Sequence, residues 1–157
     1  MHLPPDFKEL LEEFARSDVE SVLVGGYAVA FHGRPRATKD IDLVLEGSGA
    51  NLARASAAIH RFGAPENVVQ AVAAMKETEV VFMGRAPLRV DLLRTIDGVP
   101  AKQLFSRAVL AELDGVTVRV IALDDLITNK RAAARPQDLL DAELLERIRA
   151  ARAQVRT

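Results

Sequence analysis

The chain has 157 residues, no cysteine and a formal net charge of -1, and 49% of its residues are hydrophobic. Without cysteine there are no disulfides and no thiolate metal site, and a charge near zero argues against a general nucleic-acid coat. No apolar run approaches a membrane span, and the start of the chain lacks the basic and long apolar segments of a signal peptide. We therefore expect a single domain over residues 1–157 in the cytoplasm, with no membrane partner.

The first half of the chain alternates between helix and strand signals. Asp6 can cap a helix in which apolar residues recur at helical spacing: Phe7, Leu10, Leu11 and Phe14. The elements expected next, in chain order, are a strand over 21–24, a helix over 27–32, a strand over 40–45, a helix over about 49–62 and a short helix over 66–75.

The second half begins with a predicted hairpin. Residues 79–83 and 88–93 read as its strands, joined by Gly84-Arg85-Ala86. A helix over about 101–112, a strand over 116–121 and two helices, over about 123–134 and 137–153, complete the pattern. The chain therefore predicts an α+β fold, in which helices flank a mixed β-sheet and the C-terminal helices begin near residue 123.

Two glycines follow the first predicted strand. Gly25 and Gly26 read as a tight turn between that strand and a helix. Residues without a Cβ let a phosphate approach the backbone closely, and the N–H groups of a helix start face it with the positive end of the helix dipole. This segment therefore predicts an anion site.

Three aspartates lie in the next strands. Asp40 and Asp42 share one face of their strand because successive side chains alternate, and Asp91 is the single acid in the apolar strand after the hairpin turn. Like charges held together resist burial unless a cation lies between them, and Mg²⁺ accepts one or two carboxylates with phosphate oxygens. If the strands are neighbours, the three carboxylates could form a two-metal site for phosphoryl or nucleotidyl transfer.

Two basic clusters accompany these motifs. One precedes the acids and contains Arg34, Arg36 and Lys39, and the other lies on the later helical segment and contains Lys130, Arg131 and Arg135. Either cluster could meet a triphosphate or an RNA backbone.

The ordered set Val24-Gly25-Gly26, Asp40-Ile41-Asp42 and Asp91 resembles the nucleotidyltransferase superfamily, which shares its fold with DNA polymerase β. Within it, residues 25–45 look most like the AbiEii-type toxin nucleotidyltransferases and the aminoglycoside or lincosamide nucleotidyltransferases. The resemblance is good over about residues 20–95 and weaker later. There, the segment from Leu123 to Lys130, together with Asp138 and Asp141, looks like the AbiEii-type ending.

The resemblance implies transfer of a nucleoside monophosphate from an NTP to a hydroxyl, with release of pyrophosphate. Asp40 and Asp42 would bind two Mg²⁺ or Mn²⁺ ions, and Asp91 would bind the catalytic metal and help to deprotonate the hydroxyl. The implied nucleotide-binding residues are Gly25, Gly26, Arg36, Lys39 and Lys130.

Other interpretations stay open at this stage. A nucleotidyltransferase fold without catalysis could serve as a regulator or binding partner, including half of a toxin–antitoxin pair. A haloacid-dehalogenase-type phosphatase, with Asp40 as its nucleophile, fits less well because it explains neither the glycines nor Asp91. The acceptor could be a small molecule, RNA such as a tRNA 3′ end, or a protein hydroxyl, and a homodimer or a cognate antitoxin could complete the site.

Overall fold

A six-stranded mixed sheet forms the centre of the protein in the computed structural model, which describes residues 1–33 and 37–156. The strands lie in the order β3-β4-β2-β1-β6-β5. Their bounds are β1 Ser21–Val24, β2 Asp40–Leu45, β3 Val81–Met83, β4 Arg89–Leu93, β5 Val109–Leu113 and β6 Val116–Val120. Central β1 is antiparallel to β2 and parallel to β6, and β2 is parallel to β4. Two antiparallel hairpins, β3-β4 and β5-β6, form the edges.

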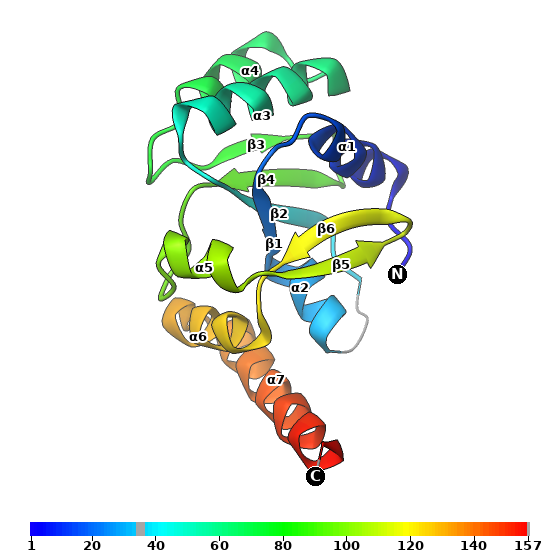
Figure 1. Ribbon diagram of the computed structural model, residues 1–157, viewed down its shortest axis with the longest axis vertical. Helices are drawn as coiled ribbons and strands as arrows, with labels where there is room; N and C mark the ends of the chain where they lie inside the picture. Colours follow the sequence, from blue (N-terminus) through cyan, green and yellow to red (C-terminus); the bar gives the residue numbers. More distant parts are fainter. Residues whose placement is uncertain (34–36, 157) are drawn as a thin grey trace.

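The helices lie on both sides of this sheet (Figure 1). In that view α3 and α4 lie above the strands, α1 lies beside β3 and β4, and α5 lies at the level of β5, whereas α2 and α6 lie lower and α7 runs away from the body towards the C-terminus. Their bounds are α1 Pro5–Arg16, α2 Gly25–His32, α3 Gly49–Phe62, α4 Glu66–Ala73, α5 Ala101–Arg107, α6 Leu123–Ala133 and α7 Pro136–Val155. This arrangement confirms the predicted α+β class with a mixed sheet flanked by helices.

The apolar stripe of α1 packs onto the sheet as its spacing predicts. Phe7, Leu10, Leu11 and Phe14 are all buried, and the ring of Phe7 meets the edge of Tyr27 from α2 at 5.8 Å between centroids. An apolar stripe at helical spacing gains stability only when a second layer covers it, and here the sheet supplies that layer. Among the described residues, none of the helices combines the length and the apolar character needed to cross a bilayer.

Strand β2 separates an apolar face from an acidic one. Ile41, Leu43 and Leu45 are buried, whereas Asp40 and Asp42 are partly buried on the other face. The alternation follows from the two-residue period of a strand, and it fixes the register because a slip of one residue would bury both carboxylates. The core therefore holds the acids at the surface of the sheet.

One predicted element is wrong. The helix expected over 101–112 ends at Arg107, and residues Val109–Leu113 form the edge strand β5 instead. The strand pairs with β6 through a turn in which Asp114 has φ 50° and Gly115 has φ 81°. Left-handed conformations at both central residues make the tight hairpin that Asp-Gly favours, so pairing with β6 overrides the local helical spacing.

Smaller differences concern the ends of elements. The helix expected from residue 27 begins at Gly25 without an intervening turn, and the first hairpin strand begins at Val81. The two C-terminal helices begin at Leu123 and Pro136, close to their predicted positions.

Candidate active site

The junction of β1 and α2 places a helix start against the acidic face of β2. Gly25 has φ +68°, and a Cβ built on it would lie 2.9 Å from Cγ of Asp42, closer than real Cβ atoms approach. Both the conformation and this contact require glycine at residue 25. Within the described part of the chain, no side chain caps α2, so the N–H groups of its first turn remain available to a ligand.

The register of the sheet brings the predicted acids together. In the parallel pair of β2 and β4, Asp42 lies opposite Asp91 and Asp40 lies opposite Arg89. On the other side of β2, Asp42 lies opposite Val24, the last residue of β1. The carboxylates of Asp40, Asp42 and Asp91 therefore share one sheet face, beside the start of α2.

Arg89 neutralises part of this acidic group. Its Nε donates to Oδ1 of Asp91 at 2.7 Å, and its Nη2 donates to Oδ2 of Asp91 at 3.1 Å and to Oδ2 of Asp40 at 3.4 Å. The guanidinium also lies over the ring of Phe82, with 4.7 Å from Cζ to the ring centroid. Arg89 thus supplies to Asp91 and Asp40 the positive charge that paired carboxylates need.

Among the described residues, Lys130 is the cation that lowers the pKa of Asp42, and it does not offset the causes that raise it. Burial is the largest cause that raises the pKa of Asp42 to about 7, followed by the charge of Asp91 and a hydrogen bond with it. The charge of Asp40 raises the pKa further, while Lys130 lowers it. A carboxyl group whose charge is so unfavourable marks the place where an added cation would be stabilised most.

The donor set suits a hard divalent cation. Carboxylate oxygens are the ligands that Mg²⁺ and Mn²⁺ prefer, and Arg89 shows that the carboxylates of Asp40 and Asp91 can share a cation. Among the described residues, no three acidic or histidine side chains stand close enough, as they lie, to hold a metal ion. Arg89 occupies the acids, so they would have to exchange the guanidinium for the metal.

A cleft of about 750 Å³ opens beside the acids. Its walls bring together the start of α2, the acids of β2, the segment after β4 and the junction of α6 and α7. The polar lining residues include Gly25, Gly26, Thr38, Asp40, Asp42, Asp97, Asn129, Lys130, Arg135, Gln137 and Asp138. A second hollow of about 480 Å³, bounded by α1 and by β5 and β6, contains none of the predicted site residues, so the chemistry points to the first cleft.

The predicted cations lie in different places. Lys130 is buried in the wall of the cleft. Lys39 is exposed just before β2, where its carbonyl accepts a hydrogen bond from the N–H of Arg89 at 3.1 Å. Arg36 lies outside the described residues. Asp91 is only 7% exposed and lies next to the cleft, in contact with Arg89.

Lys130 is held by acids of α7. Its Nζ lies 3.2 Å from Oδ1 of Asp138 and 3.3 Å from Oδ2 of Asp141. Arg135 donates to Asp138 as well, at 2.6 Å. Burial opposes the charge of Asp138, but the hydrogen bonds from Arg135 and Lys130 outweigh it and hold the pKa of this carboxyl below its usual range. The ammonium of Lys130 is therefore fixed in the cleft wall.

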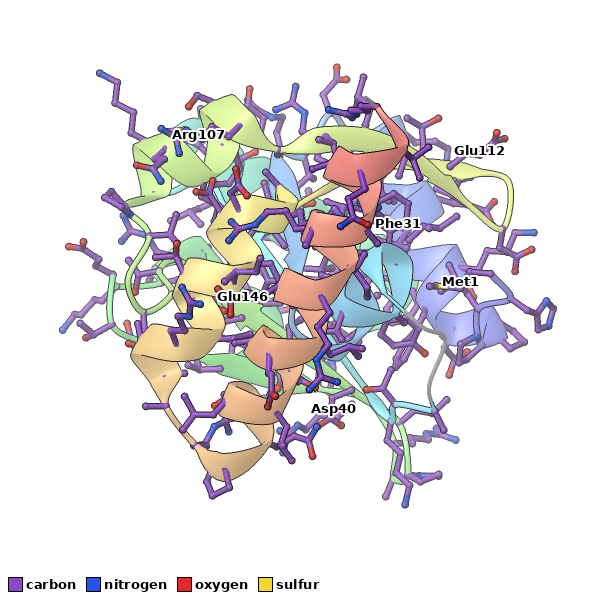
Figure 2. The ribbon with its side chains drawn as sticks, turned by 90° about the horizontal axis from the view of Figure 1, so that it is seen from below. Met1, Phe31, Asp40, Arg107, Glu112 and Glu146 are labelled. Atoms are coloured by element: carbon purple, nitrogen blue, oxygen red, sulfur yellow. The ribbon has the colours of Figure 1, made fainter. Side chains whose placement is uncertain are left out.

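Figure 2 shows α6 and α7, the two helices to which this network belongs. Seen from their side, the two helices lie next to each other in front of the sheet, and Glu146 lies between them, where it pairs with Arg131 of α6. The contact of α6 with α7 fixes the position of the junction between these helices, which lines the cleft.

Sequence reasoning missed Arg89 and Phe82. The signal for Arg89 was present, because a residue two positions before Asp91 in a strand must lie on the same face. Phe82 could not be placed beside Asp91 without the hairpin register, which sets the two residues opposite each other.

The fold and this arrangement of glycines and acids define a protein of the nucleotidyltransferase class. A family model described as "Nucleotidyl transferase of unknown function (DUF2204)" matches residues 5–156, and the chain belongs to this family. The family confirms the resemblance of the sequence to nucleotidyltransferases. No curated protein matches the chain.

Solved structures of nucleotidyltransferases share the fold. The solution structure of the antibiotic-resistance factor ANT(2″)-Ia superposes with a TM-score of 0.58 at 15% identity, over 96% of this chain and 89% of that one. A crystal structure of the same factor with adenylyl-2″-tobramycin gives a TM-score of 0.56 at 16% identity, over 96% and 94% of the two chains. The lincosamide antibiotic adenylyltransferase LnuA, in a lincomycin-bound crystal structure, gives 0.52 at 11% identity, over 93% and 98%.

Proposed function

We propose that this protein transfers a nucleoside monophosphate from an NTP to a hydroxyl group, with the help of divalent cations. The observation that carries the proposal is the contact of the α2 start with the acids: Gly25 lies against Asp42, and Asp42 lies opposite Asp91. An anion site and a cation site in contact are what a metal-bound triphosphate requires.

The roles of the residues follow from their positions. The N–H groups at the start of α2, with Gly25 and Gly26, would bind triphosphate oxygens, because the helix dipole and the open backbone favour negative charge there. Lys130 would offset phosphate charge from the opposite wall of the cleft, although Asp138 and Asp141 share its ammonium. Lys39 and Arg36 stay predicted nucleotide contacts.

Asp40, Asp42 and Asp91 would hold the cations, Mg²⁺ or Mn²⁺. When bound, these ions would offset the repulsion between the acids and the triphosphate and stabilise the charge of the transition state.

The chemical step balances as an in-line displacement. The acceptor oxygen forms a bond to the α-phosphorus, and the bond from that phosphorus to the oxygen bridging to the β-phosphate breaks. Pyrophosphate leaves with the electron pair, and the hydroxyl proton passes to the carboxylate of Asp91. Catalysis then consists mainly of positioning and charge stabilisation, because the protein forms no covalent intermediate.

The first test is direct labelling. Purified protein is incubated with Mg²⁺, each α-³²P-labelled NTP and a cell extract that contains RNA, protein and small molecules. Label carried into a product by the wild type, and lost in the Asp40→Asn/Asp42→Asn variant, would support transfer and reveal the acceptor class. The matched control is Asp6→Asn/Asp124→Asn, which removes two exposed acids outside the cleft.

The same test addresses the alternative. If no label is transferred and circular dichroism shows a native fold, the chain is better explained as a binding or regulatory protein of this fold. Copurification of a helical partner would then favour the toxin–antitoxin pair. The cytoplasmic location and the homodimer stay predictions of the sequence.

A further inference from the structure

A basic rim lies at the end of the sheet where β2 and β4 begin, next to the acids. It consists of Lys39, Arg85 and Arg89, which are all exposed at the same end of the sheet. Lys39 directly precedes β2 and its carbonyl accepts from the N–H of Arg89, and Arg85 lies in the turn between β3 and β4, where its carbonyl accepts from Leu88 at 2.9 Å. Arg89 therefore contacts the carboxylates directly, and Lys39 and Arg85 lie in the backbone segments that lead into the same end of the sheet.

Arg89, a residue of this rim, has two kinds of partner, carboxylates and an aromatic ring. Its guanidinium is shared by Asp91 and Asp40, and it also stacks on Phe82 of the neighbouring strand. The Arg89 side chain is 51% exposed and Phe82 is 53% exposed, so both can reach a ligand. Phe82 therefore presents an aromatic face to solvent beside the guanidinium of Arg89.

Arg89 contacts the acids and the ring of Phe82 through separate interactions. If Asp40 and Asp91 bound a divalent cation, Arg89 would lose its carboxylate partners and would still have the ring of Phe82 as a partner. Arg89 then has free donors in a planar fork, which fits a phosphate in two parallel hydrogen bonds.

We propose that this rim binds a phosphate group of the acceptor, next to the hydroxyl that is nucleotidylated, and that Arg89 binds it after releasing the acids. The inference rests on the proposed function and names its acceptor class. With divalent cations bound to Asp40, Asp42 and Asp91, the uncompensated charges of Lys39, Arg85 and Arg89 would repel a polycationic acceptor such as tobramycin. Phe82 offers a face on which a base can stack.

The phosphate has two sources, the 3′ end of an RNA strand or a small sugar phosphate. The net charge of -1 favours a local footprint of one or two phosphates rather than a long stretch of backbone. For single strands, a footprint of two phosphates predicts a slope of about -1.4 in a plot of log affinity against log salt.

The test measures binding rather than turnover. A 5′-fluorescein octaribonucleotide with a free 3′-hydroxyl is titrated with full-length protein, Mg²⁺ and α,β-methylene-ATP, and anisotropy gives its affinity. We expect Arg89→Gln to weaken this affinity about tenfold and to reduce the salt slope to about -0.7. Arg119→Gln, which changes an exposed arginine of strand β6, should stay within about twofold.

A second readout tests the exchange itself. Without nucleotide, Mn²⁺ binding followed by electron paramagnetic resonance should be tighter in Arg89→Gln than in the wild type, because the competing guanidinium is gone. Phe82→Leu, which leaves the charges in place, should weaken the octaribonucleotide about threefold by removing the stack. Unchanged octaribonucleotide affinity in both Arg89→Gln and Phe82→Leu overturns the proposal.

Competition identifies the source of the phosphate. Displacement of the octaribonucleotide by ribose 5-phosphate assigns the rim to a small phosphate-bearing acceptor. If ribose 5-phosphate does not displace the octaribonucleotide, and a methylphosphonate version of the strand does not bind, the rim is assigned to RNA. Displacement by tobramycin but not by phosphates overturns the proposal. Failure of the wild type to bind the ATP analogue with Mg²⁺ would instead refute the proposed function. Normal binding of that analogue, with unchanged octaribonucleotide affinity in Arg89→Gln and Phe82→Leu, refutes this inference alone.

Discussion

Gly25→Ala tests how tightly the helix start and the acids are joined. Gly25 has φ +68°, and the new methyl group would meet the carboxylate of Asp42. Holding alanine in the left-handed conformation costs about 1–2 kcal/mol. Forcing the Asp42 side chain off its rotamer adds about 1 kcal/mol, so we expect the free energy of unfolding to fall by about 2–3 kcal/mol.

The measurement is urea unfolding of chelator-treated protein in a double-mutant cycle. In an Asp42→Ala background the carboxylate is absent, so Gly25→Ala should cost only the backbone share, about 1–2 kcal/mol. Gly49→Ala is the matched control, since a Cβ there meets nothing within 4 Å. It should leave stability unchanged within about 0.5 kcal/mol.

The coupling between residues 25 and 42 decides the outcome. Equal costs of Gly25→Ala in both backgrounds would refute the contact of this backbone with Asp42. The same variant should also weaken binding of the ATP analogue, because the displaced carboxylate belongs to the proposed metal site and lies against the start of α2.

Three further predictions concern single groups. Asp42→Asn should stabilise metal-free protein by about 2 kcal/mol at pH 8 and far less at pH 4. The folded pKa of Asp42, about 7, lies above the ordinary 3.8, so the wild type loses stability as the pH rises through the folded pKa, and water in the cleft screens part of the charge. Urea midpoints measured against pH check this prediction. Asp91→Asn should slow labelling at least about tenfold while the affinity for the ATP analogue changes little, and equal losses would make Asp91 structural. Burial lowers the pKa of His32, whose Nε2 lies 2.6 Å from the carbonyl oxygen of Ile121, so its contribution is complete above the unfolded value of 6.5 and is lost as pH falls below it. His32→Gln should flatten that part of the stability profile between pH 7.5 and pH 5, and an unchanged profile would contradict a buried neutral His32.

Much of the fold could be predicted because local pattern and tertiary structure agree. The apolar stripe of α1 and the alternation of β2 each have one stable solution, which is burial of the apolar face. Strand β5 could not be predicted from spacing alone, because Val109 and Leu110 are exposed at the edge and carry no alternating pattern. Asp114-Gly115 was the usable signal there.

The site residues that lie close together in the sequence were predictable. Gly25, Asp40 and Asp42 lie within one segment, so their order and the two-residue period suffice. The partners of Lys130 depend on how α6 and α7 meet, and the stacking of Arg89 on Phe82 depends on hairpin register. Such contacts arise between elements, where sequence spacing carries no information about distance.

The burial of α2 has a consequence for the energetics of ligand capture. Tyr27, Ala28, Val29 and Ala30 are all buried, so the helix is held on several sides and its first turn is already in place before any ligand arrives. Little conformational entropy is then lost when the N–H groups bind an anion, because the first turn of α2 is preorganised for binding. Amide hydrogen exchange in α2 should accordingly be slow in the free protein and change little on saturation with the ATP analogue.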